Sequence, residues 1–347
     1  MFISIYFFVP SIILICYFVL TLIYTFKNKK IKIENKIFIN EILIALLFLT
    51  AGILFPFMYQ YHSPDLTQSS LNLLWITTST FFVIEMGIWA ITLIYNSIIS
   101  KKNPDIMAER NYAKFCEEFN KNWVDDLKSE LGRKLLHLFT CTVIFIFWTI
   151  GTILESLGIL SFWGLDNYSF SFWLIITVGY GFVFMFQIAD LTRLNRFYML
   201  PKWARKWYLD MKQNELNTFI ASTPLVLSFT PFIFAPFPIF AAVALITTIS
   251  DGVACIIGKK YGKKILRTNN KKTVEGLIAG GLSTFIIVLL ISIIYYPWMP
   301  LPIEKILIMC LVATLIFMLI DAYVKNISDN ILNPILTGFG MWMIFLI

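Results

Sequence analysis

The residues most able to carry chemistry lie between positions 251 and 276, where an apolar run ends and a charged segment follows it. Asp251, Ala254, Gly258 and Gly262 follow one another at intervals of three, four and four residues, which places them on one face if the helix continues that far. Three of these residues are alanine or glycine, so another backbone or a ligand can approach this face closely. Asp251 lies inside the apolar run, where an ionisable group is costly and is usually functional.

The segment after this face has the densest positive charge in the chain. Seven Lys and Arg residues lie between positions 258 and 275. Lysines that flank an apolar run usually set the orientation of a membrane helix, and this accounts for the lysines between 259 and 264. It does not account for Asp251 or for the small-residue spacing. An acid, bare backbone and the paired Lys271 and Lys272 suit a nucleotide triphosphate with its metal ion.

The complete pattern, D-x2-A-x3-G-x3-G-x8-K-K-T-x-E-G, resembles the nucleotide-binding signature of the CTP-dependent lipid kinases. This family includes dolichol kinase, phytol kinase and the CTP-using diacylglycerol kinases. The resemblance implies a catalytic role for Asp251 and a set of nucleotide-binding residues. These are Ala254, Gly258, Gly262, Lys271, Lys272, Thr273, Glu275 and Gly276. The phosphatidate cytidylyltransferases carry a similar stretch, so the motif indicates CTP and lipid more firmly than it indicates a kinase.

A second block, Glu130-x2-Arg133-Lys134-x2-His137, is similar to the N-terminal signature of the same kinase family. Arg133 and His137 are four residues apart and therefore share a helix face. The resemblance implies that Arg133 and Lys134 contact phosphate or the lipid head, and that His137 lies near the lipid hydroxyl. A lone histidine beside a membrane span is more often structural, and only the combination of residues favours a functional role.

A third block, Asp329-Asn330-x3-Pro334, is similar to the C-terminal block of the family, so the resemblance extends from about residue 130 to residue 347. Asp321 lies eight residues before Asp329, where the family often has Glu. We expect Asp329 and Asn330 to reach the metal or the transferred phosphate. An Asp-Asn pair before a proline can also form an ordinary helix cap or turn.

Four further polar residues form a second tier of candidates. Asp190 and Arg193 are three residues apart at the end of an apolar run and can simply pair with each other. Glu215 begins the sixth apolar segment, where an acid is favoured at a helix N-terminus and where the family tends to carry one. Asp321 lies near the end of an apolar run and needs a partner or a cation.

The composition excludes a soluble globular protein. The chain has 347 residues, of which 58% are hydrophobic and 14% are charged, and the mean hydropathy is +0.76. These values predict a polytopic membrane protein. The five cysteines show no paired spacing, and two histidines are too few for a histidine-based metal site. The net charge of +7 does not indicate nucleic acid, because lysines that fix topology and meet anionic head groups explain it.

An all-α fold with about ten transmembrane helices follows from ten apolar segments that are long enough, or nearly so, to span a bilayer. They are 2–26, 38–57, 71–99, 135–155, 170–190, 217–234, 237–257, 276–296, 304–324 and 332–347, and the sixth and tenth are the weakest. Lys325 and the four segments 27–36, 100–134, 190–216 and 258–275 hold 27 of the 28 basic residues. This alternation predicts a multi-pass protein with both termini outside and every motif loop in the cytosol.

The predicted organisation has three parts: an N-terminal three-span extension (1–100), a cytosolic amphipathic segment (101–133) and a seven-span catalytic domain (134–347). The middle part places apolar residues at helical spacing. They are Tyr112, Phe115, Cys116, Phe119, Trp123, Leu127 and Leu131. A helix of this kind either lies in the membrane surface or packs on other cytosolic loops, and both interpretations fit.

The leading functional hypothesis is transfer of the γ-phosphate of CTP to a membrane lipid alcohol. Mg²⁺ or another divalent cation would be held by Asp251, Glu275 and Asp329, and the general base is His137 or Asp329. No G-x4-G-K-[ST] motif is present. Dolichol, polyprenol, phytol and diacylglycerol each present one hydroxyl on an apolar body, so all remain candidate acceptors.

Two alternatives belong to other classes. A CTP-dependent cytidylyltransferase that makes a CDP-lipid would share the D-x2-A…K-T-x-E-G stretch, but the K-R-x4-K-D block of those enzymes is not present. A transporter or scaffold would fit the span count, but the two halves show no internal repeat. The expected partners are the bilayer, a nucleotide triphosphate and a lipid alcohol, without nucleic acid. The oligomeric state is open.

Overall fold

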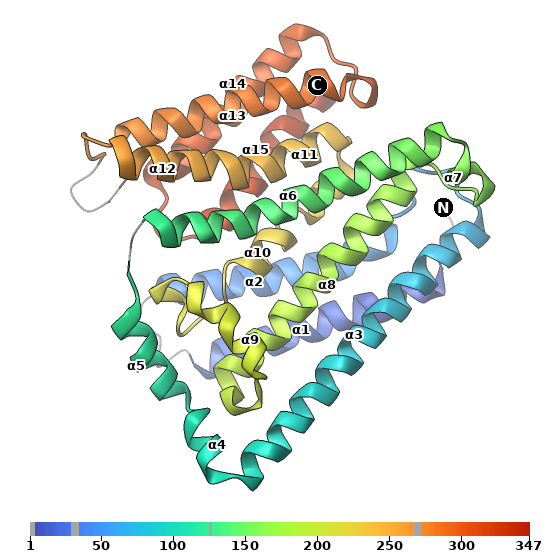
Figure 1. Ribbon diagram of the computed structural model, residues 1–347. Helices are drawn as coiled ribbons and strands as arrows, with labels where there is room; N and C mark the ends of the chain where they lie inside the picture. Colours follow the sequence, from blue (N-terminus) through green and yellow to red (C-terminus); the bar gives the residue numbers. More distant parts are fainter. Residues whose placement is uncertain (1–3, 29–34, 125–126, 267–271) are drawn as a thin grey trace. The chain divides into compact units, whose positions relative to one another are not determined.

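The computed structural model is mainly helical in the residues that it describes, which are 4–28, 35–124, 127–266 and 272–347 (Figure 1). These residues contain no β-strand, so the predicted all-α class is confirmed. Eight helices in this described part of the chain are long and apolar enough to cross a membrane, which indicates a helical membrane protein. They are Ile5–Lys27, Lys36–Phe57, Gln68–Lys102, His137–Ser156, Asn167–Met199, Phe237–Tyr261, Val274–Ile294 and Ile303–Tyr323.

The predicted count of ten spans is not confirmed, because two of the predicted segments form shorter or more polar helices. The segment 217–234 contains a shorter apolar helix, Ser222–Phe234, in which Pro224 and Pro231 remove backbone donors. The segment 332–347 lies in helix α15 (Asp329–Leu346), which begins with Asp329 and Asn330. Polar residues in its first turn lower the hydropathy of this 18-residue helix.

The chain divides into two compact units. Unit 1 contains residues 1–129 and 157–227, and unit 2 contains residues 130–156 and 228–347. The helices of unit 1 are η1 (Ile5–Phe7), α1 (Phe8–Lys27), α2 (Asn35–Leu54), η2 (Phe55–Phe57), α3 (Gln68–Lys102), α4 (Pro104–Glu109), α5 (Tyr112–Asn122), α7 (Ile159–Phe162), α8 (Asn167–Arg196), η3 (Phe197–Met199), α9 (Lys202–Lys206), η4 (Trp207–Asp210), η5 (Gln213–Glu215) and α10 (Ser222–Leu227). The predicted division at residues 100 and 133 separates parts of the chain by their expected role in catalysis, and it stays a prediction.

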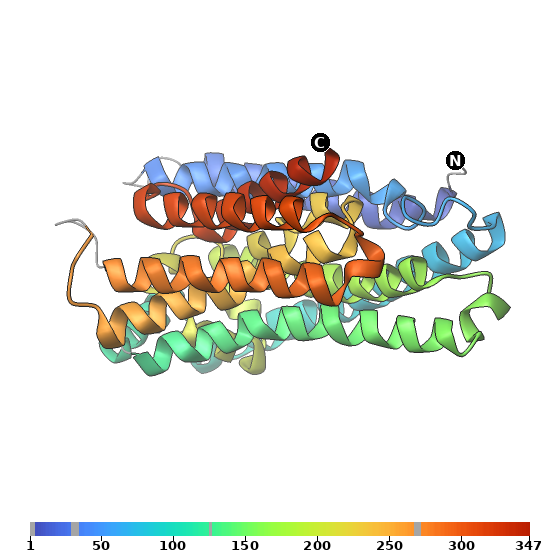
Figure 2. The ribbon, with the colours of Figure 1, turned by 90° about the horizontal axis from the view of Figure 1, so that it is seen from above.

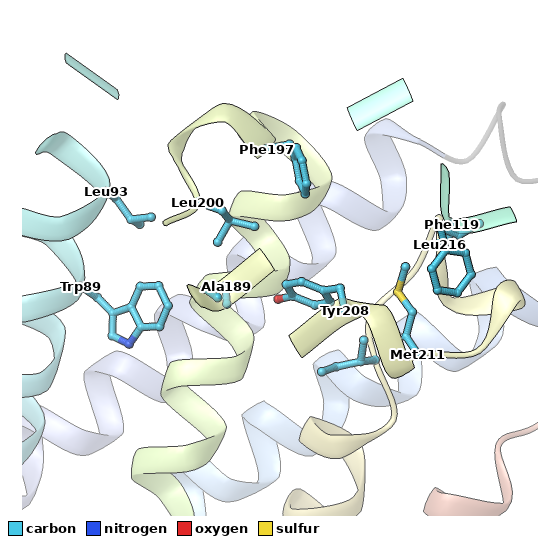
Figure 3. Packing of buried hydrophobic residues seen from close by; sticks show 11 residues of the cluster. Trp89, Leu93, Phe119, Ala189, Phe197, Leu200, Tyr208, Met211 and Leu216 are labelled. Atoms are coloured by element: carbon cyan, nitrogen blue, oxygen red, sulfur yellow. The ribbon is translucent and has the colours of Figure 1, made fainter. Parts of the chain in front are cut away.

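In unit 1, a buried cluster joins the ends of α3 and α8 to the segment that follows α8 (Figure 3). The cluster contains Trp89, Leu93, Phe119, Ala189, Phe197, Leu200, Ala204, Tyr208, Met211, Leu216 and Ile220. The apolar face of α5 completes it, since Phe119 is buried and Phe115 lies 5.1 Å from Phe197 between ring centroids. Of the two interpretations of this amphipathic helix, the structure therefore shows packing on other segments of the chain.

Unit 2 is built on a helix interrupted by one wide turn. Its elements are most of α6 (Leu127–Ser156), η6 (Thr230–Phe234), α11 (Phe237–Leu245), the π-helical turn η7 (Ile246–Ser250), α12 (Asp251–Tyr261), α13 (Val274–Ile294), η8 (Tyr296–Trp298), α14 (Ile303–Tyr323) and α15. Helices α12 to α15 pack as successive neighbours, and Figure 2 shows them from a second direction. Short connections make neighbouring helices antiparallel. The α12–α13 connection and the α14–α15 connection therefore lie at the same end of unit 2.

Helix α6 contacts the α11–η7–α12 helix through residues at seven-residue intervals. Trp148 stacks on Phe237 with ring centroids 3.5 Å apart. Cys141 Sγ lies 3.0 Å from Thr248 Oγ1, and Lys134 bonds to Asp251. A spacing of seven residues is two helical turns, so one face of α6 makes all three contacts.

The outward faces of unit 2 carry stripes of exposed apolar residues. Leu282, Ile286 and Leu290 follow one another every four residues on α13 and are exposed. Helix α14 repeats this pattern with Leu311, Leu315 and Leu319, which are also exposed. Long apolar stripes without polar cover are typical of surfaces that meet lipid.

Candidate functional site

The first contact of the candidate site joins the N-terminal block to the nucleotide motif. Lys134 Nζ donates to Asp251 Oδ2, although the two residues are 117 positions apart. Lys134 lies in the N-terminal part of α6, and Asp251 is the first residue of α12. The side chains are 15% and 16% exposed, so the pair is largely but not fully removed from solvent. The predicted catalytic acid therefore has a cation as its partner.

The π-helical turn η7 lies directly before Asp251 and carries three buried hydroxyl groups. Thr247 and Thr248 donate to backbone carbonyls one turn earlier, at 2.8 and 2.9 Å. Ser250 Oγ lies 3.4 Å from Ser283 Oγ of α13. Turns of this kind are rare and are often found at functional sites. We therefore treat η7 as part of the candidate site, although no motif in the sequence indicated it.

His137 lies on the face of α6 that meets this turn. Lys134 precedes it by three residues and Cys141 follows it by four, and both contact the η7–α12 junction. Residues at these intervals share a helix face. The structure therefore brings His137 to the side of unit 2 where Asp251 lies, and its role near a lipid hydroxyl stays a prediction. The side chain of Arg133 lies outside the described part of the chain, and its backbone belongs to the same helix.

The small residues of α12 face the start of α13. A Cβ atom on Gly262 would lie 2.2 Å from Gly258 O and 2.5 Å from Thr273 Cγ2. A Cβ atom on Gly276 would lie 2.6 Å from Ala254 O and 3.0 Å from Gly258 Cα. Ala254, Gly258, Gly262 and Gly276 therefore let two backbones meet. The spacing allows either another backbone or a ligand to approach this face. In the structure the backbone at the start of α13 occupies it, and contact with a nucleotide stays a prediction.

The end of the nucleotide motif is a helix start. Thr273 is the N-cap of α13, and its hydroxyl accepts from the backbone N–H of Gly276 at 3.3 Å. Two backbone hydrogen bonds of 2.9 Å close the loop before it, from Leu266 to Lys272 O and from Val274 to Lys264 O.

Glu275 in the first turn of α13 supports the same loop. Its carboxylate accepts from the backbone N–H of Lys264, with both oxygens at 3.3 Å. A carboxylate at this position also favours the positive end of the helix. The predicted metal ligand Glu275 therefore has a local structural role. Lys271 lies outside the described residues.

A second ion pair joins the nucleotide motif to the C-terminal region. Lys272 Nζ donates to Asp321 Oδ1, 49 positions away in the chain. Asp321 belongs to the last turn of α14, and its side chain is 9% exposed, whereas that of Lys272 is 34% exposed. The second-tier residue Asp321 is thereby brought to the candidate site, together with one of the two predicted phosphate-binding lysines.

The C-terminal block begins α15. Asp329 is the first residue of the helix, and its Oδ1 accepts from the backbone N–H of Asn330 at 3.0 Å. Asn330 and Asn333 are buried. The Oδ1 atom of Asn333 has no hydrogen-bond partner among the described residues, and its side chain is only 2% exposed. The sequence analysis did not single out Asn333. It lies three residues after Asn330 and so shares a helix face with it, and this spacing could have indicated it.

The predicted metal ligands do not form a group in the described residues. No set of three or more His, Cys, Asp or Glu residues in that part of the chain is arranged to hold a metal ion. Asp251 is paired with Lys134, and Glu275 accepts from the chain before it. Asp251, Glu275 and Asp329 are therefore not grouped as a three-carboxylate metal site in the described residues, and their role toward a metal stays a prediction.

Asp190 and Arg193 belong to unit 1, in a fully buried network. Arg193 Nε donates to Asp190 Oδ1 at 3.0 Å, and both side chains are 0% exposed. The guanidinium also donates to the backbone carbonyls of Leu216 and Thr218 and lies 4.7 Å from the ring centroid of Tyr208. Asp190 Oδ2 accepts from the backbone N–H of Ile220 at 2.8 Å. The network therefore fastens the segment after α8 to α8 itself.

Two residues outside the spans complete this network. Tyr112 Oη accepts from Arg193 at 3.0 Å and donates to Leu216 O, and burial raises the pKa of Tyr112 to about 12. Glu215 accepts from the backbone N–H groups of Lys212 and Ala221 at 2.8 and 3.1 Å. Burial raises the pKa of Glu215 as well. Three of the four second-tier residues, Asp190, Arg193 and Glu215, thus have structural roles in unit 1.

No protein-family model matches this chain, and no match was found among the curated proteins or the solved structures.

Proposed function

We propose that this chain is a CTP-dependent lipid kinase that transfers the γ-phosphate of CTP to the hydroxyl of a membrane lipid alcohol. One observation carries the proposal: one ion pair joins the first two sequence blocks, and another joins the second block to the helix that precedes the third. Lys134 of the first block meets Asp251 of the second, and Lys272 of the second meets Asp321 beside the third. The proximity of these charged residues, which are far apart in the sequence, supports one shared site.

The chemistry of the proposal uses the two lysines as phosphate ligands. Phosphoryl transfer depends on in-line positioning and on neutralisation of the negative charge that spreads over the phosphate oxygens. Lys272 directly precedes the N-terminus of α13, where the helix dipole adds partial positive charge. Lys134 supplies a second cation at Asp251. The described carboxylates form no metal group, so the proposal assigns charge neutralisation to these lysines and to the helix terminus.

The acceptor hydroxyl needs a base in the same part of unit 2. His137 lies three residues after Lys134 on the face of α6 that contacts η7, and Asp329 begins α15. Either group can take the hydroxyl proton as the oxygen attacks phosphorus and CDP leaves. The apolar stripes on α13 and α14 suit the body of a lipid that approaches from the bilayer.

The proposal includes a topology with ten membrane segments, both termini outside and the motif loops in the cytosol. The basic segments support it, because 27 of the 28 Lys and Arg residues fall on one predicted side. In a cysteine-free background, single cysteines near positions 115, 205 and 264 should resist an impermeant thiol reagent in intact cells. Cysteines near 64, 163 and 299 should react. Reaction near 264 from outside would separate the motif from cytosolic CTP.

The decisive experiment follows the two labels of CTP. Detergent-purified full-length protein is incubated with CTP labelled at the γ- or the α-phosphate and with a panel of lipid alcohols. We expect the γ-label in a lipid monophosphate and the α-label in soluble CDP. Appearance of the α-label in lipid, with release of pyrophosphate, would replace the kinase with a cytidylyltransferase. Transport activity without transfer of either label would favour a transporter.

A matched pair of lysine variants makes this experiment specific. Lys134→Ala removes the cation at Asp251, whereas Lys305→Ala removes a lysine at the start of α14, on the predicted opposite side of the membrane. We expect Lys134→Ala to lose transfer and Lys305→Ala to keep it. Equal rates in both variants would remove Lys134 from the site.

A further inference from the structure

The two residues of the Lys272–Asp321 pair differ in their exposure to solvent. Asp321 is nearly buried in the last turn of α14, where the helix dipole disfavours a negative charge. Lys272 is one-third exposed and lies directly before the N-cap Thr273. Asp321 therefore depends on the lysine for compensation, whereas the lysine has access to solvent and to incoming ligands.

The lysine is only partly saturated by this contact. A lysine ammonium has three donors, and Asp321 is its hydrogen-bond partner among the described residues. The ammonium is a point charge on a flexible stem, so it can change partners with little loss of geometry. A single carboxylate can thus hold the lysine in place without excluding a second anion.

We propose that Asp321 is a positioning residue that holds Lys272 beside the start of α13 and yields it to a phosphate oxygen when the triphosphate binds. This inference rests on the proposed function and concerns the same site. The carboxylate fixes the lysine before the ligand arrives. It also competes with the ligand, because a phosphate that reaches Lys272 meets the negative charge of Asp321.

The test measures binding of inorganic tripolyphosphate and of CTP to the full-length protein in detergent. Asp321→Asn keeps the size of the side chain and removes its charge. We expect it to lower the dissociation constant of both anions by about fivefold, because the partly screened repulsion between the anion and Asp321 is removed. Asp321→Glu, which retains the charge, should bind as the wild type does. An unchanged or weakened affinity in Asp321→Asn would overturn the proposal.

A second pair of variants separates positioning from folding. Lys272→Ala leaves Asp321 nearly buried without its cation, so this variant is expected to lose thermal stability. Lys272→Ala/Asp321→Asn should recover that stability while tripolyphosphate binding stays weak. Wild-type affinity in the double variant would show that Lys272 never contacts the anion and would equally overturn the proposal.

The outcomes also separate this inference from the proposed function. Tighter tripolyphosphate binding by Asp321→Asn without any transfer of γ-label to lipid would leave the inference standing and remove the kinase. Transfer of γ-label with no change in anion affinity between the wild type and Asp321→Asn would remove the inference alone.

Discussion

The Arg193–Asp190 pair of unit 1 differs in its environment from the Lys134–Asp251 and Lys272–Asp321 pairs of unit 2, although each joins a cation to a carboxylate. In unit 1, Arg193 and Asp190 are fully buried, and backbone groups from the segment after α8 saturate both side chains. In unit 2, Lys134 is paired with Asp251 and Lys272 with Asp321, and these side chains keep part of their surface exposed. A planar, saturated guanidinium serves as a fixed structural joint, whereas a partly exposed ammonium can accept another anion.

The comparison separates polar residues that look alike in the sequence. Asp190, Asp251 and Asp321 all lie near the end of an apolar run, where an acid is costly. Their partners decide what they do: a buried arginine with many acceptors makes Asp190 structural, and a single lysine makes Asp251 and Asp321 candidates for a site. The predictions below test this division.

The largest effect is expected from Arg193. Arg193→Ala leaves Asp190 buried without its cation and removes donors to Leu216 and Thr218, which should cost about 3–5 kcal/mol of stability. Arg193→Lys should not restore it, because one ammonium cannot replace the planar set of donors. Thermal unfolding in detergent provides the measurement. A stable Arg193→Lys protein would contradict the idea of a fixed joint.

Lys134 should affect turnover more than stability. Lys134→Ala removes a cation from the proposed phosphate site, and loss of one such group typically lowers kcat by about 100- to 1,000-fold. The pair is partly exposed, so its loss should shift the unfolding temperature less than the change at Arg193 does. Transfer of γ-label and thermal unfolding are measured on the same samples. A variant with normal turnover and strongly reduced stability would make Lys134 structural, like Arg193.

The contact between α12 and α13 predicts a difference between two glycines of one helix region. Gly262→Ala places a Cβ atom 2.5 Å from Thr273 Cγ2 at the start of α13, and 2.2 Å from Gly258 O of α12, so we expect a loss of about 1–3 kcal/mol of stability. Gly252→Ala is the matched control, because its Cβ atom would have no neighbour within 4 Å. Alanine there should be neutral or slightly stabilising. Equal stability of the two variants in thermal unfolding would argue against the tight α12–α13 contact.

The smallest expected effect concerns the edge of the network in unit 1. Tyr112→Phe removes the hydroxyl that accepts from Arg193 and donates to Leu216 O, at a cost of about 1 kcal/mol. Tyr95→Phe is the control, because Tyr95 is exposed on α3. Thermal unfolding compares the two variants. A change at Tyr112 no greater than at Tyr95 would restrict the joint to Arg193 and Asp190.

Much of the fold followed from hydropathy, because long apolar segments have few alternatives to helices in a membrane. The count of ten spans is not confirmed, because segment 217–234 contains only a shorter helix with two prolines and polar first-turn residues lower the hydropathy of the helix in segment 332–347. The amphipathic spacing was correctly detected from Tyr112 to Phe119, but the helix ends at Asn122, and Leu127 and Leu131 belong to α6. The sequence did not show whether α5 packs on lipid or on protein, because its partners Phe197 and Leu216 are distant in the sequence and meet it only in the folded chain.

The site was predictable where residues are close together in the chain. The spacing of Ala254 and Gly258 correctly placed them on one face of α12, and Gly262 follows as the C-cap of that helix. The partner of Lys272 was not predictable, because 49 residues separate it from Asp321 and only tertiary packing brings them together. The roles assigned to nucleotide, lipid and metal stay predictions.

The wide turn η7 has a consequence for the length of the chain. A π-helical turn accommodates one residue more than an α-helical turn does, so the loss of one residue between 246 and 250 would leave an ordinary helix with both flanks still in phase. Asp251 would keep its direction toward Lys134. The loss of one residue between Asp251 and Gly258 would instead turn the rest of α12 by about 100° and move its glycines away from Gly276. Single-residue changes in length are therefore tolerable on one side of Asp251 and damaging on the other.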